Sequence, residues 1–214
     1  MKNFDRKKFD IVIFANGEKP NNEIPISITR NTRYAVCCDG ALQKMRELGR
    51  EPDFVVGDCD SLSAETIAEL GSSLVKIKEQ ETNDLSKAFH FAIKHFNIDN
   101  PSIAIIGATG LREDHSVGNI FHLIDFSSIA PDVTIVSDYG CFIAVRGEQT
   151  FSHYPNKAVS IFAPFPNTKI ISSGLLWPLE GVELKYLWSG TLNKTDSETI
   201  SLNTNNPIVV YFPF

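Results

Sequence analysis

The order of apolar runs and helical patterns along the chain constrains its fold more than any other feature of the sequence. Short apolar segments of the kind that form strands alternate with segments whose apolar residues recur at helical spacing. Several strand segments are apolar throughout, as are parallel strands that are covered on both faces. The predicted strands are residues 9–15, 34–38, 54–56, 74–77, 103–106 and 133–136, and the predicted helices are 41–48, 64–70, 85–96 and 117–126. This series predicts an open, parallel α/β sheet.

The last third of the chain has a different pattern. After about Arg146 the helical period disappears, and short β-rich runs are separated by Pro, Gly and Asn residues. These runs are residues 158–163, 169–173, 182–188, 199–202 and 208–212. We therefore predict an α/β domain over residues 1–146 and a small antiparallel β domain over residues 147–214. No long linker separates them, so the two domains are expected to pack closely.

Composition and charge exclude several classes of protein. The chain has 214 residues, and its formal net charge of −6 gives no basic surface for DNA, RNA or an anionic membrane. No apolar stretch approaches the ~18–20 residues that span a bilayer, and the charged N-terminus lacks the apolar region of a signal peptide. We expect a cytoplasmic protein without a nucleic-acid or membrane partner. The four cysteines form no CxxC pair and are expected to be reduced and mostly buried.

Three polar, acid-rich segments stand where predicted strands end and helices begin. They are residues 57–61 with Asp58 and Asp60, residues 79–84 with Asp84, and residues 107–115. Two carboxylates one residue apart cost free energy unless a cation or strong donors compensate, and hard oxygen ligands suit Mg²⁺. Asp, Asn or Ser at such positions also commonly caps the next helix, which is the alternative for each residue alone. The coincidence of three such loops at the carboxyl edge of a parallel sheet favours a metal site there.

The third segment carries a weak phosphate-binding signal. Its glycines, Gly107 and Gly110, follow a strand but lack both the GxGxxG pattern and the Walker ending, so no P-loop kinase is predicted. Arg112 offers a planar guanidinium that can bind phosphate oxygens through two hydrogen bonds, and Asp114 or His115 could position it. For His115 alone, a helix-start or surface position is the alternative.

Together these motifs resemble the thiamine pyrophosphokinase family in order and spacing. The motifs are Asp39-Gly40-Ala41, Pro52-Asp53 through Gly57-Asp58-Cys59-Asp60-Ser61, Gln80-Glu81 through Asp84, Gly107 through Arg112-Glu113-Asp114-His115 with Asn119 beyond, and Gly174 through Trp177-Pro178-Leu179. The resemblance covers nearly the whole chain. Gly-Asp-x-Asp-Ser combined with Arg-x-Asp-His is its specific part, whereas Asp-Gly or Gly-x-x-Trp alone would mean little.

The resemblance implies a fold, a reaction and a set of site residues. The family joins a Rossmann-like α/β domain to a C-terminal antiparallel β-sandwich, forms a homodimer, and transfers a pyrophosphoryl group from ATP to the hydroxyl of thiamine, releasing AMP. Mg²⁺ would be held by Asp58, Asp60 and Asp84. ATP would be contacted by Asp39, Ser61, Gln80, Glu81, Arg112 and His115, and thiamine by Trp177, Ser189, Thr191 and Asn193.

The residues that carry the reaction in this interpretation are Asp58, Asp60, Asp84, Arg112 and Asp114. Phosphoryl-type transfer depends on positioning and charge neutralisation more than on covalent catalysis, which explains why the sequence shows no Ser/His/Asp or Cys/His set. The base that accepts the hydroxyl proton stays open: Asp114 is one candidate, and metal-lowered acidity of the hydroxyl is the other.

The sequence departs from the family pattern at several positions. Leu192 replaces the serine of a late Ser-Asn pair, so Ser189 or Thr191 would have to supply that hydroxyl. Glu81 and Asn83 replace an aspartate and a threonine, which preserves polarity and carboxylate count. Two rival functions stay open: a relative that pyrophosphorylates a hydroxymethylpterin, and a non-catalytic sensor of nucleotide or thiamine diphosphate.

Overall fold

The computed structural model describes Phe4 and residues 7–214. The first part of the chain alternates strands and helices as expected: β1 (Ile11–Phe14), α1 (Glu23–Asn31), β2 (Tyr34–Cys38), the 3₁₀ turn η2 (Asp39–Ala41), α2 (Leu42–Glu47), β3 (Phe54–Gly57), α3 (Ala64–Leu70), the 3₁₀ turn η3 (Gly71–Ser73), β4 (Leu74–Lys76), α4 (Asp84–Phe96), β5 (Ser102–Ile106), α5 (Glu113–Phe126) and β6 (Asp132–Val136). The second part holds β7 (Gly140–Ser152), β8 (Ala158–Phe162), β9 (Lys169–Ser173), β10 (Glu180–Glu183), β11 (Gly190–Lys194) and β12 (Thr199–Pro213).

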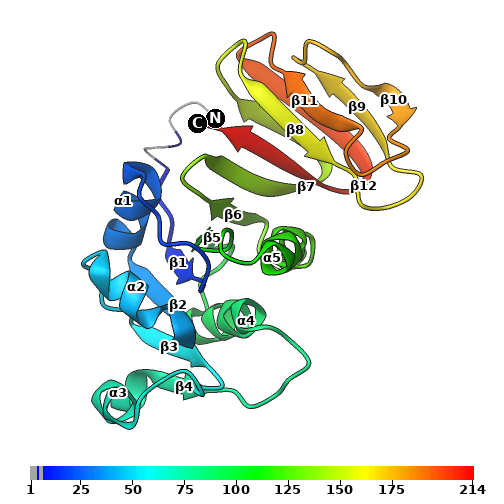
Figure 1. Cartoon of the computed structure of the whole chain (residues 1–214). Helices are drawn as coiled ribbons and strands as arrows, with labels where there is room; N and C mark the ends of the chain where they lie inside the picture. The colour runs from blue at the N-terminus through cyan, green and yellow to red at the C-terminus, as the bar shows by residue number, and fades with distance from the viewer. Residues whose placement is uncertain (1–3, 5–6) are drawn as a thin grey trace.

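Strands β1 to β6 form a parallel sheet in the order β6-β5-β1-β2-β3-β4. Helices α1 and α2 lie on one face of this sheet and α4 and α5 on the other (Figure 1). Because all six strands run in one direction, the loops that follow β1, β2, β3, β4 and β5 lie at the same edge. The predicted α/β fold class is confirmed, and its topology gathers the acid-rich loops at that edge.

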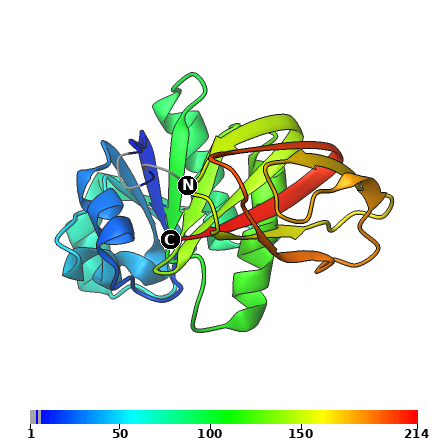
Figure 2. The same ribbon diagram turned by 90° about the horizontal axis from the view of Figure 1, so that it is seen from above.

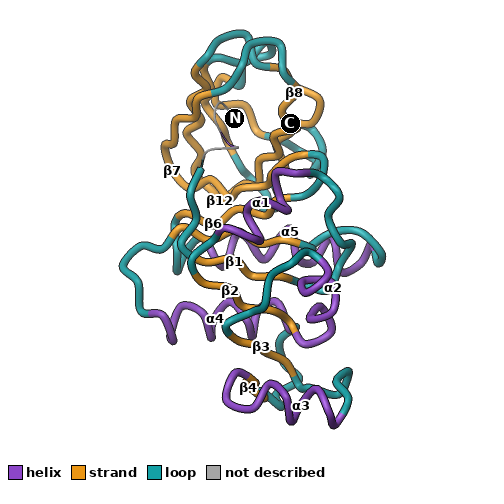
Figure 3. Tube along the Cα trace, turned by 90° about the vertical axis from the view of Figure 1, so that its left-hand side faces the viewer, coloured by secondary structure: helices purple, strands orange, loops and turns teal. Residues whose placement is uncertain are grey.

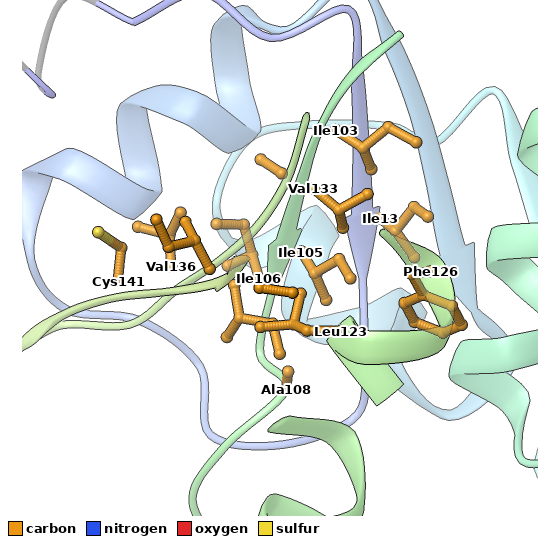
Figure 4. Packing of buried hydrophobic residues seen from close by; sticks show 14 of the residues in the cluster. Ile13, Ile103, Ile105, Ile106, Ala108, Leu123, Phe126, Val133, Val136 and Cys141 are labelled. Atoms are coloured by element: carbon orange, nitrogen blue, oxygen red, sulfur yellow. The ribbon is translucent and has the colours of Figure 1, made fainter. Parts of the chain in front are cut away.

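The core between the sheet and its helices explains why these strands are apolar throughout. Phe89 of α4 stacks on Phe126 of α5 with ring centroids 4.0 Å apart. Figure 4 shows Leu123 and Phe126 packed beside Ile13 and Ile105 of the sheet. Burying each such side chain contributes about 1.5–3 kcal/mol. The apolar faces of α4 and α5 therefore fix both helices, and with them the loops that precede each helix.

The antiparallel half is built around the long pair β7 and β12. β6 pairs antiparallel with β7, so the two halves share one sheet in the described chain: ten strands follow one another along a continuous path, and β8, which pairs with β12, and β11, which pairs with β8, branch from it. The register of β12 shifts between Thr204 and Ile208: before the shift it pairs with β9, and after it with β8. Figure 2 shows β12 reaching from the α/β half into the β half. The buried residues of the antiparallel half, such as Val159, Ile161 and Val210, belong to the same hydrophobic cluster as those of the α/β half.

Several element predictions need correction. Helix α1 was not predicted, although Asn22 caps it by accepting a hydrogen bond from the Ile24 N–H at 2.9 Å. Residues 199–202 and 208–212 belong to one strand, because the register shift accommodates the intervening Asn residues and Pro207. The β-rich run 182–188 is a strand only to Glu183. β7 and β11 were missed as well. The division into residues 1–146 and 147–214, whose boundary lies within β7, stays a prediction.

No helix in the described part of the chain is long and apolar enough to cross a membrane. All four cysteines are buried and unpaired, as expected.

Candidate active site

A pocket of about 460 Å³ opens at the carboxyl edge of the parallel sheet. Of the predicted site residues, Asp84, Arg112 and His115 line it. The remaining lining includes Asn16, Gly17, Cys38, Lys44, Asn83, Leu85, Ala108, Gly110, Leu111 and Asn119. The pocket thus brings together the N-termini of α4 and α5, where backbone N–H groups and the helix dipole favour negative ligands.

Asp39, at the end of β2, is a buried carboxylate that supports the neighbouring acidic loop. It is 5% exposed, and its oxygens accept hydrogen bonds from the Cys59 N–H at 2.8 Å and the Gly40 N–H at 2.6 Å. Burial raises the pKa of this carboxyl group above its usual value, while the two N–H donors act against that rise. A Cβ at Gly57 would overlap the Asp39 carboxylate, so only glycine fits at the end of β3. The structure therefore places Asp39 beneath the acidic loop.

The Asp58–Asp60 loop folds back on itself. Asp58 accepts a hydrogen bond from the Asp60 N–H at 3.1 Å and a longer one, at 3.5 Å, from the side-chain amide of Gln80. These donors hold the pKa of Asp58 below its usual value, with the Asp60 N–H as the larger cause. The exposed Asp60 carboxylate lies 3.9 Å from the Lys76 ammonium. Ser61 is exposed at the end of the loop. The structure thus brings Asp58 and Gln80, two of the predicted site residues, together.

The segment before α4 is organised by a residue that the sequence analysis did not single out. Glu79 accepts hydrogen bonds from the backbone N–H groups of Glu81 at 2.7 Å and Thr82 at 3.0 Å, and also from the Thr82 hydroxyl. The Thr82 hydroxyl is the main reason that the pKa of Glu79 is lowered. Asn83 then caps α4 through the Ser86 N–H at 2.9 Å. Glu79 and Asn83 therefore fix the loop that carries Gln80 and leads to Asp84, while Glu81 stays exposed.

The carboxylates of Asp58, Asp60 and Asp84 suit Mg²⁺ by chemistry but do not form a closed cage. Within the described residues, no three His, Cys, Asp or Glu side chains are close enough to make a metal-binding group on their own. Mg²⁺ usually keeps several waters and is held by one or two carboxylates together with substrate phosphates. An open acidic edge beside a pocket is compatible with that mode of binding, in which the substrate completes the coordination.

Arg112 and Asp114 form an exposed ion pair at the start of α5. The guanidinium donates two hydrogen bonds to the carboxylate, at 3.1 and 2.6 Å, and the His115 N–H donates a third at 2.9 Å. The Arg112 guanidinium is the main cause that lowers the pKa of Asp114 to about 2. A carboxylate with so low a pKa is a weak proton acceptor near neutral pH. The geometry fits Asp114 as a group that orients Arg112 better than as a base.

Lys44 and Asn119 hold the pocket loops in place and were not predicted as site residues. The Lys44 ammonium donates to the backbone oxygens of Asn16 and Gly17, at 3.0 and 2.8 Å, and to the Asn16 side-chain oxygen at 2.7 Å. Asn119 is buried and joins two loops, donating to the Ala108 carbonyl at 2.9 Å and accepting from the Asn83 amide at 3.2 Å. The sequence placed Asn119 in a motif but gave no signal for the Lys44 contacts, which depend on tertiary packing.

In the β half, Trp177 is presented to solvent and held by Asn193. Trp177 is 55% exposed, whereas Asn193 is buried. The Asn193 amide donates to the Trp177 carbonyl at 2.7 Å, and its oxygen accepts from the Trp177 N–H at 3.3 Å and the Lys194 N–H at 2.8 Å. The structure therefore brings Asn193 and Trp177 together, with the Asn193 amide bonded to backbone groups.

A short turn over residues 186–189 leads into β11, the strand that carries Thr191, Leu192 and Asn193. The Ser189 hydroxyl accepts from the Tyr186 N–H at 3.2 Å, and the Thr191 hydroxyl donates to the Trp188 carbonyl at 2.9 Å. Leu192 follows in a left-handed conformation with φ 60° and is 79% exposed. An exposed leucine in this conformation costs backbone strain and leaves apolar area in water.

The acidic loops and the Trp177 region do not meet within one chain. The sheet path runs from β10 and β9 at one end to β3 and β4 at the other. Figures 1 and 3 show the same separation: the antiparallel strands lie at one end of the molecule and β4 with α3 at the opposite end. The predicted site residues are thus divided into two groups that a single chain keeps apart.

Comparison with known proteins finds two family models that match consecutive parts of the chain. One is described as thiamin pyrophosphokinase, catalytic domain, and matches residues 27–136. The other is described as thiamin pyrophosphokinase, substrate-binding domain, and matches residues 140–211.

Among curated relatives, a protein from Oryza sativa subsp. japonica named thiamine pyrophosphokinase 1 is 28% identical over 209 residues, which is 83% of this chain and 77% of the relative. A protein of the same name from Arabidopsis thaliana is 28% identical over 179 residues, covering 74% of this chain and 64% of its own length.

Solved structures share the fold. A thiamin pyrophosphokinase from Candida albicans has a TM-score of 0.82 at 17% identity, covering 99% of this chain and 90% of its own. A thiamin pyrophosphokinase family protein from Enterococcus faecalis has a TM-score of 0.79 at 20% identity, covering 95% and 98%.

Proposed function

Because this chain belongs to the thiamin pyrophosphokinase family, we propose that it transfers the pyrophosphoryl group of ATP to the hydroxyl of thiamine, giving thiamine diphosphate and AMP. One observation carries the proposal: the acidic loop, Arg112 and the pocket of about 460 Å³ all lie at the carboxyl edge of one parallel sheet. Ligands of open α/β sheets bind at that edge.

The donor half of the site would be assembled from the loops of the α/β domain, residues 1–146. Asp58, Asp60 and Asp84 would hold Mg²⁺, which when bound neutralises charge on the triphosphate. Arg112 presents two donors to phosphate oxygens, and Asp114 fixes the direction of its guanidinium. The remaining contacts to ATP are assigned to Asp39, Ser61, Gln80, Glu81 and His115, with Asp39 acting through the loop that it supports.

The acceptor half would lie in the β domain, residues 147–214. The exposed face of Trp177 can stack on an aromatic ring and attract the positively charged thiazolium of thiamine. Asn193 fixes the Trp177 backbone, and the hydroxyls of Ser189, just before β11, and Thr191, within β11, each bond a backbone group of the turn over residues 186–189. A held aromatic platform with nearby hydroxyls is a suitable surface for a flat, cationic substrate.

We propose a homodimer in which each site combines the donor half of one chain with the acceptor half of its partner. The separation of the two halves along the sheet supports this arrangement. Trp177, Tyr186, Trp188 and Leu192 are exposed around the acceptor half, and such apolar area is typical of a surface that another chain covers. The cytoplasmic location remains a prediction.

An assay of AMP release across acceptors tests the proposed function. Purified protein is incubated with ATP, Mg²⁺ and either thiamine, a hydroxymethylpterin or no acceptor, and AMP is measured by chromatography. We expect AMP only with thiamine. Release with the pterin alone would favour the pterin enzyme, and binding of nucleotide without AMP in any mixture would favour the sensor.

A further inference from the structure

Lys87 is a buried cation beside the acidic loops that the proposed function does not use. Its side chain is 3% exposed, and its ammonium lies 3.3 Å from the Asp84 carboxylate, one turn earlier on α4. No other lysine in residues 7–214 is buried. Apart from Ser86, the other buried residues of α4 are apolar: Leu85, Ala88, Phe89 and Ala92. An apolar side chain would satisfy packing at this position, so the charge requires another explanation.

The charge of Lys87 reaches more than one carboxylate. Besides its ion pair with Asp84, it adds to the lowering of the pKa of Asp58, after the larger effects of the Asp60 N–H and the Gln80 amide. Lys76 also stands near the acidic loop, 3.9 Å from Asp60, but its side chain is 45% exposed and water screens its charge. Lys87 is therefore the buried cation at this edge, and the carboxylate that it pairs with, Asp84, is 44% exposed.

A fixed ammonium in this position has two consequences. It offsets carboxylate charge when no metal is bound, so the acidic edge stays ordered without a metal ion. It also weakens the attraction of the same carboxylates for a divalent cation, because part of their charge is already neutralised. A metal ion would then bind weakly to the free protein and more tightly together with phosphate groups.

We propose that Lys87 is a positioning residue that lowers the metal affinity of the free acidic edge, so that Mg²⁺ enters with the nucleotide triphosphate. This inference rests on the proposed function, since it takes Asp58, Asp60 and Asp84 as metal ligands. Lys87 acts through the carboxylates and needs no contact with the substrate.

The test measures metal binding in the absence of nucleotide. Mn²⁺ is titrated by calorimetry into the unchanged protein and into Lys87→Met, whose unbranched side chain is one heavy atom shorter and carries no charge. The matched control is Lys94→Met, which removes an exposed lysine from the same helix. We expect Lys87→Met to bind Mn²⁺ about tenfold more tightly, as the loss of one nearby unit charge implies. Lys94→Met should bind as the unchanged protein does.

A second variant and a stability measurement guard against a folding defect. Lys87→Gln should also tighten Mn²⁺ binding, and for both variants the thermal midpoint should fall in EDTA and recover with Mn²⁺. Lys87→Arg, which keeps the charge, should retain the weak affinity. If neither neutral variant binds Mn²⁺ more tightly than the unchanged protein, or if both stay unfolded with Mn²⁺ present, the inference is overturned. Thiamine-dependent AMP release by the unchanged protein would then still support the proposed function, so the two failures are distinguishable.

Discussion

The Asp39 carboxylate accepts a hydrogen bond of 2.8 Å from the backbone N–H of Cys59, which stands in the left-handed conformation with φ 66°. The other oxygen of the same carboxylate accepts from the Gly40 N–H, so both oxygens are used. Cys59 separates Asp58 from Asp60, and the hydrogen bond holds it in a conformation that non-glycine residues seldom adopt. Asp39 thereby sets the conformation of the loop after β3 that carries the two aspartates.

Asp39→Asn should weaken the acidic loop, because an amide offers one acceptor oxygen where the structure uses two. We expect unfolding free energy to fall by about 1–3 kcal/mol, as for other buried donors that lose a partner. AMP release should fall with it and should need more Mg²⁺. Urea unfolding and an Mg²⁺ titration of activity check this, with Asp99→Asn, an exposed aspartate beyond α4, as the control. Unchanged stability and Mg²⁺ dependence in Asp39→Asn would show that the loop keeps its shape without this support.

Asp58→Asn, Asp60→Asn and Asp84→Asn should each remove most activity while leaving the fold intact. The amide keeps the volume of the side chain but removes a hard anionic ligand for Mg²⁺. Turnover at limiting Mg²⁺ and far-UV circular dichroism are the measurements. Near-normal turnover in all three variants would mean that these carboxylates do not hold the metal.

Arg112→Lys should lower turnover by at least about tenfold, since a two-pronged donor becomes a point charge. The KM for thiamine should change much less, because Arg112 belongs to the donor half of the site. Steady-state kinetics with each substrate varied in turn separates the two effects. If Arg112→Lys has the same kinetics as the unchanged protein, Arg112 is only a surface charge and does not bind phosphate through two hydrogen bonds.

His153 should make the protein less stable in mild acid. It is buried, its Nε2 has no hydrogen-bond partner in the described structure, and burial lowers its pKa below the usual value of 6.5. The folded protein therefore binds the proton less readily than the unfolded chain, so stability is full above about pH 6.5 and falls as the pH drops below it. Its ring stacks on Phe212 with centroids 5.1 Å apart, so His153→Phe can fill the same space.

The pH dependence is measured as the free energy of unfolding at pH 7.5 and pH 5.5. We expect His153→Phe to lose less stability than the unchanged protein over this interval. His122→Phe is the control, since His122 is partly exposed and lies 3.9 Å from the Asp125 carboxylate. If the unchanged protein and His153→Phe lose equal free energy of unfolding between pH 7.5 and pH 5.5, His153 is not the cause of the acid sensitivity.

The α/β half could be predicted closely because its signals are local. Apolar strands buried on both faces and helices with one apolar stripe give distinct patterns, and α3 has the predicted bounds, residues 64–70. The bounds of β12 could not be predicted in the same way. Its Asn residues and Pro207 are typical of a loop, and only the change of partner from β9 to β8 keeps them within one strand.

The same distinction holds for the candidate site: residues in local motifs could be predicted, and contacts between distant parts of the chain could not. Motif spacing is enough to place Asp58, Asp84 and Arg112 at one edge of the sheet, because strand ends are local features. The contacts of Lys44 with Asn16 and Gly17 join parts of the chain 27–28 residues apart, and no spacing rule predicts them. The same holds for the burial of Lys87, which follows from the packing of α4 on the sheet.

The most direct test of the account asks whether one active site combines two chains. Chains with Asp60→Asn are co-expressed with chains with Trp177→Ala under different affinity tags, and the mixed dimers are isolated after each single variant has been shown to be nearly inactive. By two-fold symmetry, one site of each mixed dimer carries both lesions and the other carries neither. The control pairs Asp60→Asn with Asp84→Asn, which leaves a lesion in every donor half. The account predicts thiamine-dependent AMP release at about half the unchanged rate in the first mixed dimer and none in the control. No recovery in the first mixed dimer would contradict it.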